Sequence, residues 1–212
     1  IEPYGIHWIE EPLPPGDLRG YAELRARSPI PLAAGEAHHT VRDFKALIDG
    51  RCIDIVQPSI PGVGGLTEAR RIAVLAQASN LRLAPHVWGG AVGLATACHF
   101  IAALADTPHT EHPPHPLMLE YDMSDNELRS RLLKEPLRLE AGHVLLPEGP
   151  GLGIDLDPLL AAASAALAET RDPEPTANFG LALGCTMAAL AKEGRDKLTL
   201  VVDAPIHAIG AW

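Results

Sequence analysis

The sequence predicts an α/β fold in which short parallel strands alternate with helices. Apolar runs of strand length alternate with segments whose apolar residues recur every three or four positions. Helices that join successive strands return the chain to the same end of a sheet, so the strands are parallel. The 212 residues are 47% hydrophobic and 21% charged, which is the composition of an ordinary folded domain.

Four apolar runs are strong strand candidates, and a fifth, which begins with a proline, is weaker. In chain order they cover residues 6–9, 30–34, 53–56, 81–84 and, more weakly, 116–119. The helices expected between them cover residues 17–27, 41–48, 66–79 and 91–105. An eight-stranded barrel usually takes about 250 residues. At 212 residues the chain is too short for a complete one, so the expected fold is a partial (β/α) barrel of TIM type.

Beyond residue 113 the alternation stops. Residues 137–139 and 144–146 flank a Glu-Ala-Gly-His turn and predict a small hairpin, and residues 158–169 predict an Ala/Leu helix. We expect a barrel portion at 1–169, a linker at 170–177 and a short α/β segment at 178–212.

Charge and cysteine usage exclude several classes of protein. The 17 Lys and Arg against 27 Asp and Glu give a net charge of −10, which repels nucleic acid and anionic membranes. No signal-like or membrane-spanning apolar stretch is present in the sequence. We therefore expect neither nucleic-acid nor membrane partners. Cys52, Cys98 and Cys185 form no C-x-x-C motif, so we expect free thiols and a cytoplasmic protein.

Polar residues follow the five strand candidates at a nearly regular step. Glu10, Glu36, Ser59, His86 and Glu120 are separated by 23 to 34 positions, about one strand–helix unit each. In a parallel barrel the carboxyl ends of the strands open on one face, so these side chains converge on one site. The alternative is that acidic residues simply end strands and cap helices.

Several short motifs surround these positions in a fixed order. They are WIEEP at 8–12, AGE at 34–36, DIVQP at 54–58, VGGLTEA at 63–69, APH at 84–86, LE at 119–120 and GPGLG at 149–153. In this order and spacing, residues 1 to about 160 resemble the mandelate racemase and muconate lactonising branch of the enolase superfamily. The glycines at 62, 64 and 65 match no phosphate-binding motif and predict a tight turn before a helix.

The resemblance implies a capped (β/α) barrel that binds Mg²⁺ and removes the proton next to a substrate carboxylate. It implies Glu10 and Glu36 as metal ligands, His86 as the general base and Glu120 as a protonated acid that hydrogen-bonds the substrate. Hard oxygen ligands suit Mg²⁺, and a cation is needed to stabilise so weak a carbon acid. The implied substrate is a small carboxylate such as an acid sugar, and the full-length enzyme is expected to be a homo-oligomer. Glu11 is expected to be structural.

The chain departs from this family in two ways. The family commonly has an Asp that pairs with the base, where this chain has Ser59, so we expect His86 to have a less elevated pKa. Asp54 lies earlier in the strand and is expected to face elsewhere. The match also begins at the fourth barrel strand and covers strands four to eight. The cap, the Lys-x-Lys base motif and a third metal carboxylate are therefore not in this sequence.

Three further features leave alternatives open. His38 and His39 are either substrate contacts or exposed loop residues. The histidines at 109, 112 and 115 suggest a transition-metal loop, although the prolines between them favour a substrate-side loop. Residues 180–184, 194–200 and 210–212 resemble a bacterial phosphoglucose isomerase or its transaldolase fusion. The functional hypotheses are therefore an acid-sugar dehydratase or racemase, a sugar-phosphate isomerase fragment, or a noncatalytic truncated or fused reading frame.

Overall fold

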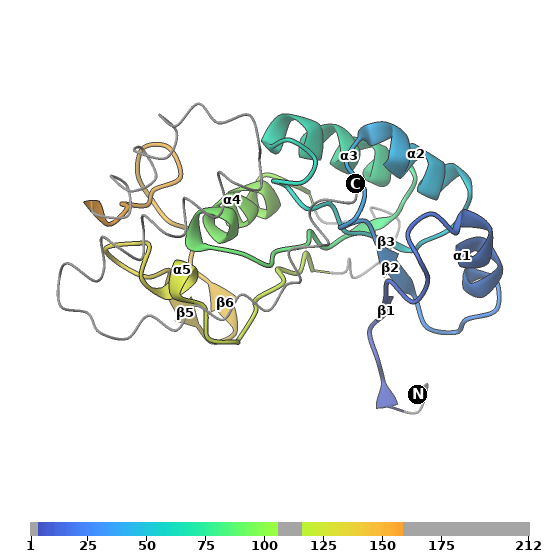
Figure 1. Ribbon diagram of the computed structural model, residues 1–212, viewed down its shortest axis with the longest axis horizontal. Helices are drawn as coiled ribbons and strands as arrows, with labels where there is room; N and C mark the ends of the chain where they lie inside the picture. Colours follow the sequence, from blue (N-terminus) through green and yellow to red (C-terminus); the bar gives the residue numbers. More distant parts are fainter. Residues whose placement is uncertain (1–3, 106–115, 159–212) are drawn as a thin grey trace, which may run out of the picture. The chain divides into compact units, whose positions relative to one another are not determined.

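A computed structural model describes residues 4–105 and 116–158, and its first part has the expected α/β architecture. Four parallel strands lie in the order β1-β2-β3-β4, each joined to the next by a helix (Figure 1). The strands are β1 (Ile9–Glu10), β2 (Leu32–Ala34), β3 (Ile55–Val56) and β4 (Arg82–Leu83). The helices are α1 (Leu18–Arg25), α2 (Val41–Asp49), α3 (Leu66–Ala78) and α4 (Ala91–Ala102). The fold is a partial TIM-type barrel, as predicted.

Local sequence signals determine where the helices begin. Before α2, the Thr40 hydroxyl accepts a hydrogen bond from the Asp43 backbone, and the Asp43 carboxylate accepts one from the Thr40 N–H. This reciprocal pair satisfies two backbone donors that the first turn leaves free. Before α1, the Asp17 carboxylate accepts a single capping hydrogen bond, from the N–H of Gly20. Gly65 precedes α3 with a φ of 109°, which confirms the predicted glycine turn.

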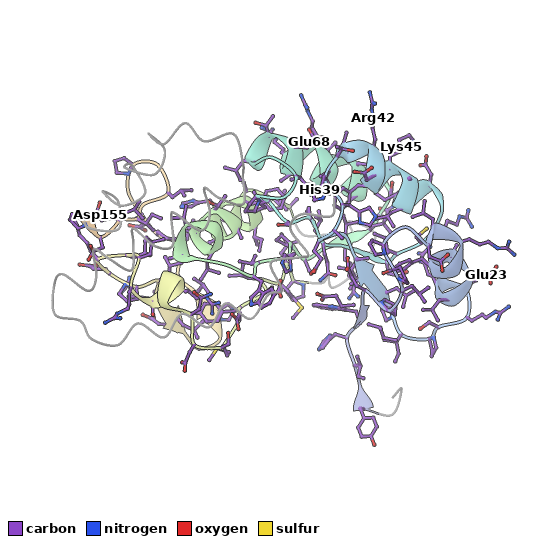
Figure 2. All side chains as sticks on the ribbon, in the orientation of Figure 1. Glu23, His39, Arg42, Lys45, Glu68 and Asp155 are labelled. Carbon is purple, nitrogen blue, oxygen red and sulfur yellow. The ribbon has the colours of Figure 1, made fainter. Side chains whose placement is uncertain are left out.

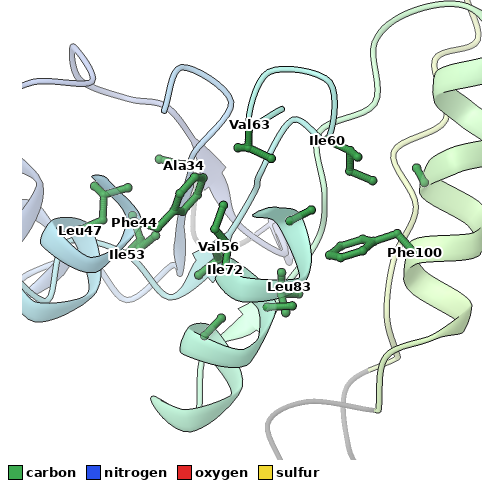
Figure 3. Packing of buried hydrophobic residues seen from close by; sticks show 14 of the residues in the cluster. Ala34, Phe44, Leu47, Ile53, Val56, Ile60, Val63, Ile72, Leu83 and Phe100 are labelled. Atoms are coloured by element: carbon green, nitrogen blue, oxygen red, sulfur yellow. The ribbon is translucent and has the colours of Figure 1, made fainter. Parts of the chain in front are cut away.

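A hydrophobic core lies between the sheet and its helices. In Figure 3, Phe44 and Leu47 of α2 and Ile72 of α3 pack with Val56 of β3 and Leu83 of β4. Charged residues occupy the outer side of the same helices, as Figure 2 shows for those labelled on α2 and α3, namely Arg42, Lys45 and Glu68. The burial of one face of each helix explains the apolar period in the sequence.

The opposite face of the sheet carries a smaller cluster of Ala33, Ile55 and Ala84, with Trp8 packed against it. Successive side chains in a strand point to opposite faces, and partners in register share a face. Glu10 pairs with Ala33, so its side chain lies on this same face, which we call the inner face. The alternation places the site on the inner face and the main core on the outer face.

The segment predicted as a fifth strand is not a strand. Residues 116–120 pair with no neighbouring strand. Pro116 has no N–H to donate to a ladder, which weakens pairing at this position. Leu117 and Leu119 nevertheless pack against the main core, so the segment keeps its place in the fold without sheet hydrogen bonds.

The predicted hairpin is present as β5 (Leu139–Glu140) paired antiparallel with β6 (His143–Val144). Ala141 and Gly142 have φ values of 49° and 80°, the pattern of a tight two-residue hairpin turn. Among the described residues, 4–105, 116–125 and 137–153 form one compact unit. The described residues 126–136 and 154–158 form a second unit. Its helix α5 (Glu127–Ser130) was not predicted, and Leu133 forms a β-bridge with Leu156.

Several predictions fall outside the described residues. They concern nearly all of the helix at 158–169, the linker at 170–177, the segment at 178–212, the histidines of the 109–115 loop and Cys185. Cys52 and Cys98 are buried free thiols, as expected. No helix in the described ranges is long and apolar enough to span a membrane.

Candidate active site

Four of the predicted site residues meet at the carboxyl ends of the strands. Nδ1 of His86 lies 2.9 Å from Oε2 of Glu36 and 3.0 Å from Oε2 of Glu120. One ligand atom from each of Glu10, His86 and Glu120 falls within 4.8 Å of the others. Three carboxylates therefore converge on one imidazole, whose side chain is only 16% exposed.

Glu10 is held by two donors that sequence reasoning did not single out. Its Oε2 accepts hydrogen bonds from Nε2 of Gln57 at 2.8 Å and from Nε1 of Trp8 at 3.1 Å. Gln57 follows Ile55 by two residues and Trp8 precedes Glu10 by two, so both belong to the inner face. The signal in the sequence that could have identified Gln57 is a polar residue on the inner face at the end of an apolar strand.

Glu120 reaches the site although its segment is not a strand. The N–H of Val87 donates to Oε2 of Glu120 at 2.6 Å, and the same oxygen faces Nδ1 of His86. One carboxylate oxygen therefore contacts two consecutive residues. This arrangement keeps Glu120 beside the imidazole without a strand ladder.

The carboxylates determine the direction of the pKa shift at His86. Burial lowers the pKa of His86, but the contact with Glu120 and the charges of Glu36, Glu120 and Glu10 outweigh it, so the pKa is raised. The contact with His86 lowers the pKa of Glu120, although burial opposes this. Burial raises the pKa of Glu36, and three neighbouring glutamates add to that effect against the attraction of His86. The neighbouring carboxylates therefore stabilise the protonated form of His86 relative to an isolated imidazole.

In the part of the chain that the structure describes, Ser59 forms no hydrogen bond with Nδ1 of His86. Its hydroxyl accepts from the N–H of Gly62 at 3.4 Å, within the turn that precedes α3. Glu120 and Glu36 supply negative charge beside His86 and raise its pKa, and the expectation that Ser59 raises it less than an Asp would stays a prediction. The contact with His86 lowers the pKa of Glu120, which favours the carboxylate over the protonated acid that the resemblance implies.

The two histidines after Glu36 make different contacts. His38 lies against Phe44, with ring centroids 5.9 Å apart, and its buried Nδ1 has no hydrogen-bond partner within the described residues. Burial lowers the pKa of His38. Nδ1 of His39 lies 3.2 Å from the carbonyl oxygen of Gly62. In the described part of the chain, neither histidine forms a hydrogen bond or ion pair with the clustered carboxylates.

Two other acids have the structural roles expected of them. Oε1 of Glu11 accepts from the N–H of Gly35 at 3.3 Å, which links the ends of β1 and β2. Asp54 faces away from the site, where Oδ1 lies 2.8 Å from Nε of Arg25 and Oδ2 accepts from the N–H of Leu32.

The cluster fits a hard divalent cation. Glu10, Glu36 and Glu120 offer carboxylate oxygens, which Mg²⁺ prefers over nitrogen and sulfur. Although Nδ1 of His86 is close to two of these carboxylates, neither oxygen is aligned for a hydrogen bond with it. A cation would relieve the repulsion between these crowded carboxylates.

The family model described as "Enolase C-terminal domain-like" matches residues 1–160. The chain belongs to the enolase superfamily. The match stops before the segment that resembles a sugar-phosphate isomerase, so that resemblance stays a prediction.

Relatives within the enolase superfamily are 32% to 41% identical to this chain over the residues that align. D-galactarolactone cycloisomerase of Agrobacterium fabrum is 41% identical over 172 residues, which cover 81% of this chain and 44% of the relative. The structure of 3,6-anhydro-D-galactonate cycloisomerase from Zobellia galactanivorans has a TM-score of 0.66 and 40% identity, covering 74% of this chain and 42% of that chain.

A structure of L-talarate dehydratase from Polaromonas sp. JS666, complexed with Mg and L-glucarate, has a TM-score of 0.62 and 32% identity. The alignment covers 76% of this chain and 40% of that one. This chain thus spans less than half the length of the superfamily members that it matches.

Proposed function

We propose that this chain supplies the metal-binding and proton-transfer residues of an enzyme that removes the proton next to the carboxylate of an acid sugar. The observation that carries the proposal is the convergence of Glu10, Glu36 and Glu120 on His86. It rests on three residues that follow separate strands and on Glu120 from an irregular segment, so a single chance contact does not explain it.

In this proposal Glu10 and Glu36 hold Mg²⁺, with Glu120 close enough to contribute a further oxygen. The cation would offset the negative charge that develops on the substrate carboxylate as its neighbouring carbon loses a proton. The two glutamates come from adjacent strand ends, whose register is set by backbone hydrogen bonds. Their role is to present charged oxygens in a fixed direction.

His86 is the proposed base. Its Nδ1 faces Glu36 and Glu120, which favours the tautomer that keeps a proton on Nδ1. Nε2 then carries the lone pair that accepts the substrate proton. Glu120 is a catalytic residue in this proposal because it contacts the base directly and stabilises the imidazolium that forms.

The substrate class follows from the relatives. Their names specify a galactarolactone, an anhydrogalactonate and L-talarate, with L-glucarate bound in one structure, all of which are acid sugars or their lactones. Dehydration or cycloisomerisation is therefore favoured over racemisation. Ser59 and His38 are proposed as substrate contacts, the latter because a buried unpartnered Nδ1 is available. The homo-oligomer stays a prediction.

Titration calorimetry with Mg²⁺ tests the metal site. The unsubstituted chain should bind the cation, and the Glu10→Gln, Glu36→Gln double variant should lose the heat, because neutral amides bind Mg²⁺ poorly. Glu140→Gln is the matched control, since this glutamate lies exposed in the β5–β6 hairpin. Equal heats from the double variant and the unsubstituted chain would contradict the assignment.

Exchange of the carbon-bound proton tests the base. In deuterated buffer, NMR should show solvent deuterium entering a galactonate or glucarate next to its carboxylate, and His86→Asn should reduce that exchange by at least tenfold. The assay needs the chain joined to the remaining part of such an enzyme, because this chain spans less than half of its relatives. Unchanged exchange by His86→Asn would show that another group is the base.

A further inference from the structure

One oxygen of Glu10 is occupied from two sides. Oε2 accepts from the Gln57 amide at 2.8 Å and from the Trp8 indole at 3.1 Å. Within the described residues, these are the hydrogen bonds of that carboxylate, and Oε1 receives none. The two oxygens of one carboxylate therefore differ in what they offer to a cation.

Gln57 is an unusual residue to find in this core. It is 4% exposed and is the polar residue that the described part of the chain buries most completely. Burying an amide is unfavourable unless its hydrogen bonds are made. Its Nε2 makes that bond to Glu10, on a strand that is not its neighbour, since β2 lies between β1 and β3.

The end of β2 is built so that Gln57 can lie close to it. A Cβ at Gly35 would lie 2.8 Å from the carbonyl oxygen of Gln57 and 2.7 Å from Cε1 of Phe44. The N–H of Gln57 donates to the carbonyl of Ala34 at 3.0 Å. The lack of a side chain at Gly35 and this backbone bond fix the position of the Gln57 backbone. They thereby determine how far its side-chain amide reaches.

We propose that Gln57 is a positioning residue of the metal site, which together with Trp8 occupies Oε2 of Glu10 and leaves Oε1 to bind the divalent cation. The inference rests on the proposed function and adds to it which oxygen coordinates and what orients it. Both donors are uncharged and the indole cannot accept, so they fix the carboxylate while its charge remains available to the cation. Groups that orient metal ligands in this way typically contribute 10- to 100-fold to metal affinity.

Binding of Mn²⁺, followed by electron paramagnetic resonance, separates this role from a purely structural one. Gln57→Leu removes the donor at similar size, and Trp8→Phe removes only the indole N–H. We expect each to weaken Mn²⁺ binding, by at least tenfold for Gln57→Leu and several-fold for Trp8→Phe, and to change the spectrum of the bound ion. Gln77→Leu on α3 is the matched control and should bind as the unsubstituted chain does.

The outcomes distinguish this inference from the proposed function. If Gln57→Leu and Trp8→Phe both bind Mn²⁺ within twofold of the unsubstituted chain and give the same spectrum, the positioning role is overturned while the metal site stands. If Gln57→Leu does not fold, Trp8→Phe alone decides, because it keeps the aromatic packing. Absence of Mn²⁺ binding by the unsubstituted chain would overturn both proposals.

Discussion

Replacing Gly35 by alanine tests the close approach of β2 and β3 that underlies the site. Gly35 has a φ of 145°, a region that residues with a side chain rarely adopt, and occupying it costs about 1–3 kcal/mol. The added Cβ would also lie 2.8 Å from a backbone carbonyl and 2.7 Å from the Phe44 ring. Overpacking of this kind costs about 1–3 kcal/mol. We therefore expect Gly35→Ala to destabilise the chain by about 2–6 kcal/mol.

Urea unfolding followed by circular dichroism measures this loss, and two other glycines separate its parts. Gly64 has a φ of 91° with no heavy atom within 4 Å of an added Cβ, so Gly64→Ala should show only the backbone term, about 1–3 kcal/mol. Gly93 lies inside α4 in open space, so Gly93→Ala should stabilise by about 0.5–1 kcal/mol. If Gly35→Ala loses no more stability than Gly64→Ala, the strand ends are not closely packed and the argument for Gln57 fails.

Two further predictions use charged groups. The Arg25–Asp54 pair is about 30% exposed, and Asp54 also accepts from the backbone N–H of buried Leu32, so Asp54→Ala should destabilise the chain by about 2–4 kcal/mol. Glu23→Ala is the control, because it breaks a well-exposed pair of similar length. It should change the free energy of unfolding by at most about 0.5 kcal/mol. Because the folded pKa of His86 is raised, its stabilisation is complete below about pH 6.5 and is lost as the pH rises through that higher pKa. Melting temperatures across this range without added metal should show the decline, and His86→Asn should remove it; a decline of the same size in His86→Asn would assign it to another group.

The sequence was informative about which side chains converge and less so about which of them touch. Apolar period located four strands and four helices, because burial of one face dictates that period. The step between strand ends then predicted that Glu10, Glu36, His86 and Glu120 would meet. A strand of only two residues, such as β1, has too few pairing partners for its bounds to be read from propensity.

The partner of His86 illustrates what the sequence pattern could not supply. By position along the strand, Ser59 was the expected neighbour, yet its hydroxyl turns toward Gly62. Glu120 takes that place from a segment that forms no strand. Contacts of this kind depend on side-chain reach and on where an irregular segment packs, neither of which has a period in the sequence.

The two consecutive glutamates at the end of β1 show why the local backbone is bent there. Neighbouring residues of a regular strand point to opposite faces, so Glu11 is not expected on the inner face with Glu10. Glu11 adopts a φ of 38°, which costs a residue with a side chain about 1–2 kcal/mol, and its carboxylate accepts a long 3.3 Å bond from the N–H of Gly35. Such a bond contributes about 1 kcal/mol, so the bend adds little net stability. The bond does link the ends of the strands that carry Glu10 and Glu36. The strained backbone at Glu11 therefore serves the site rather than the stability of the core.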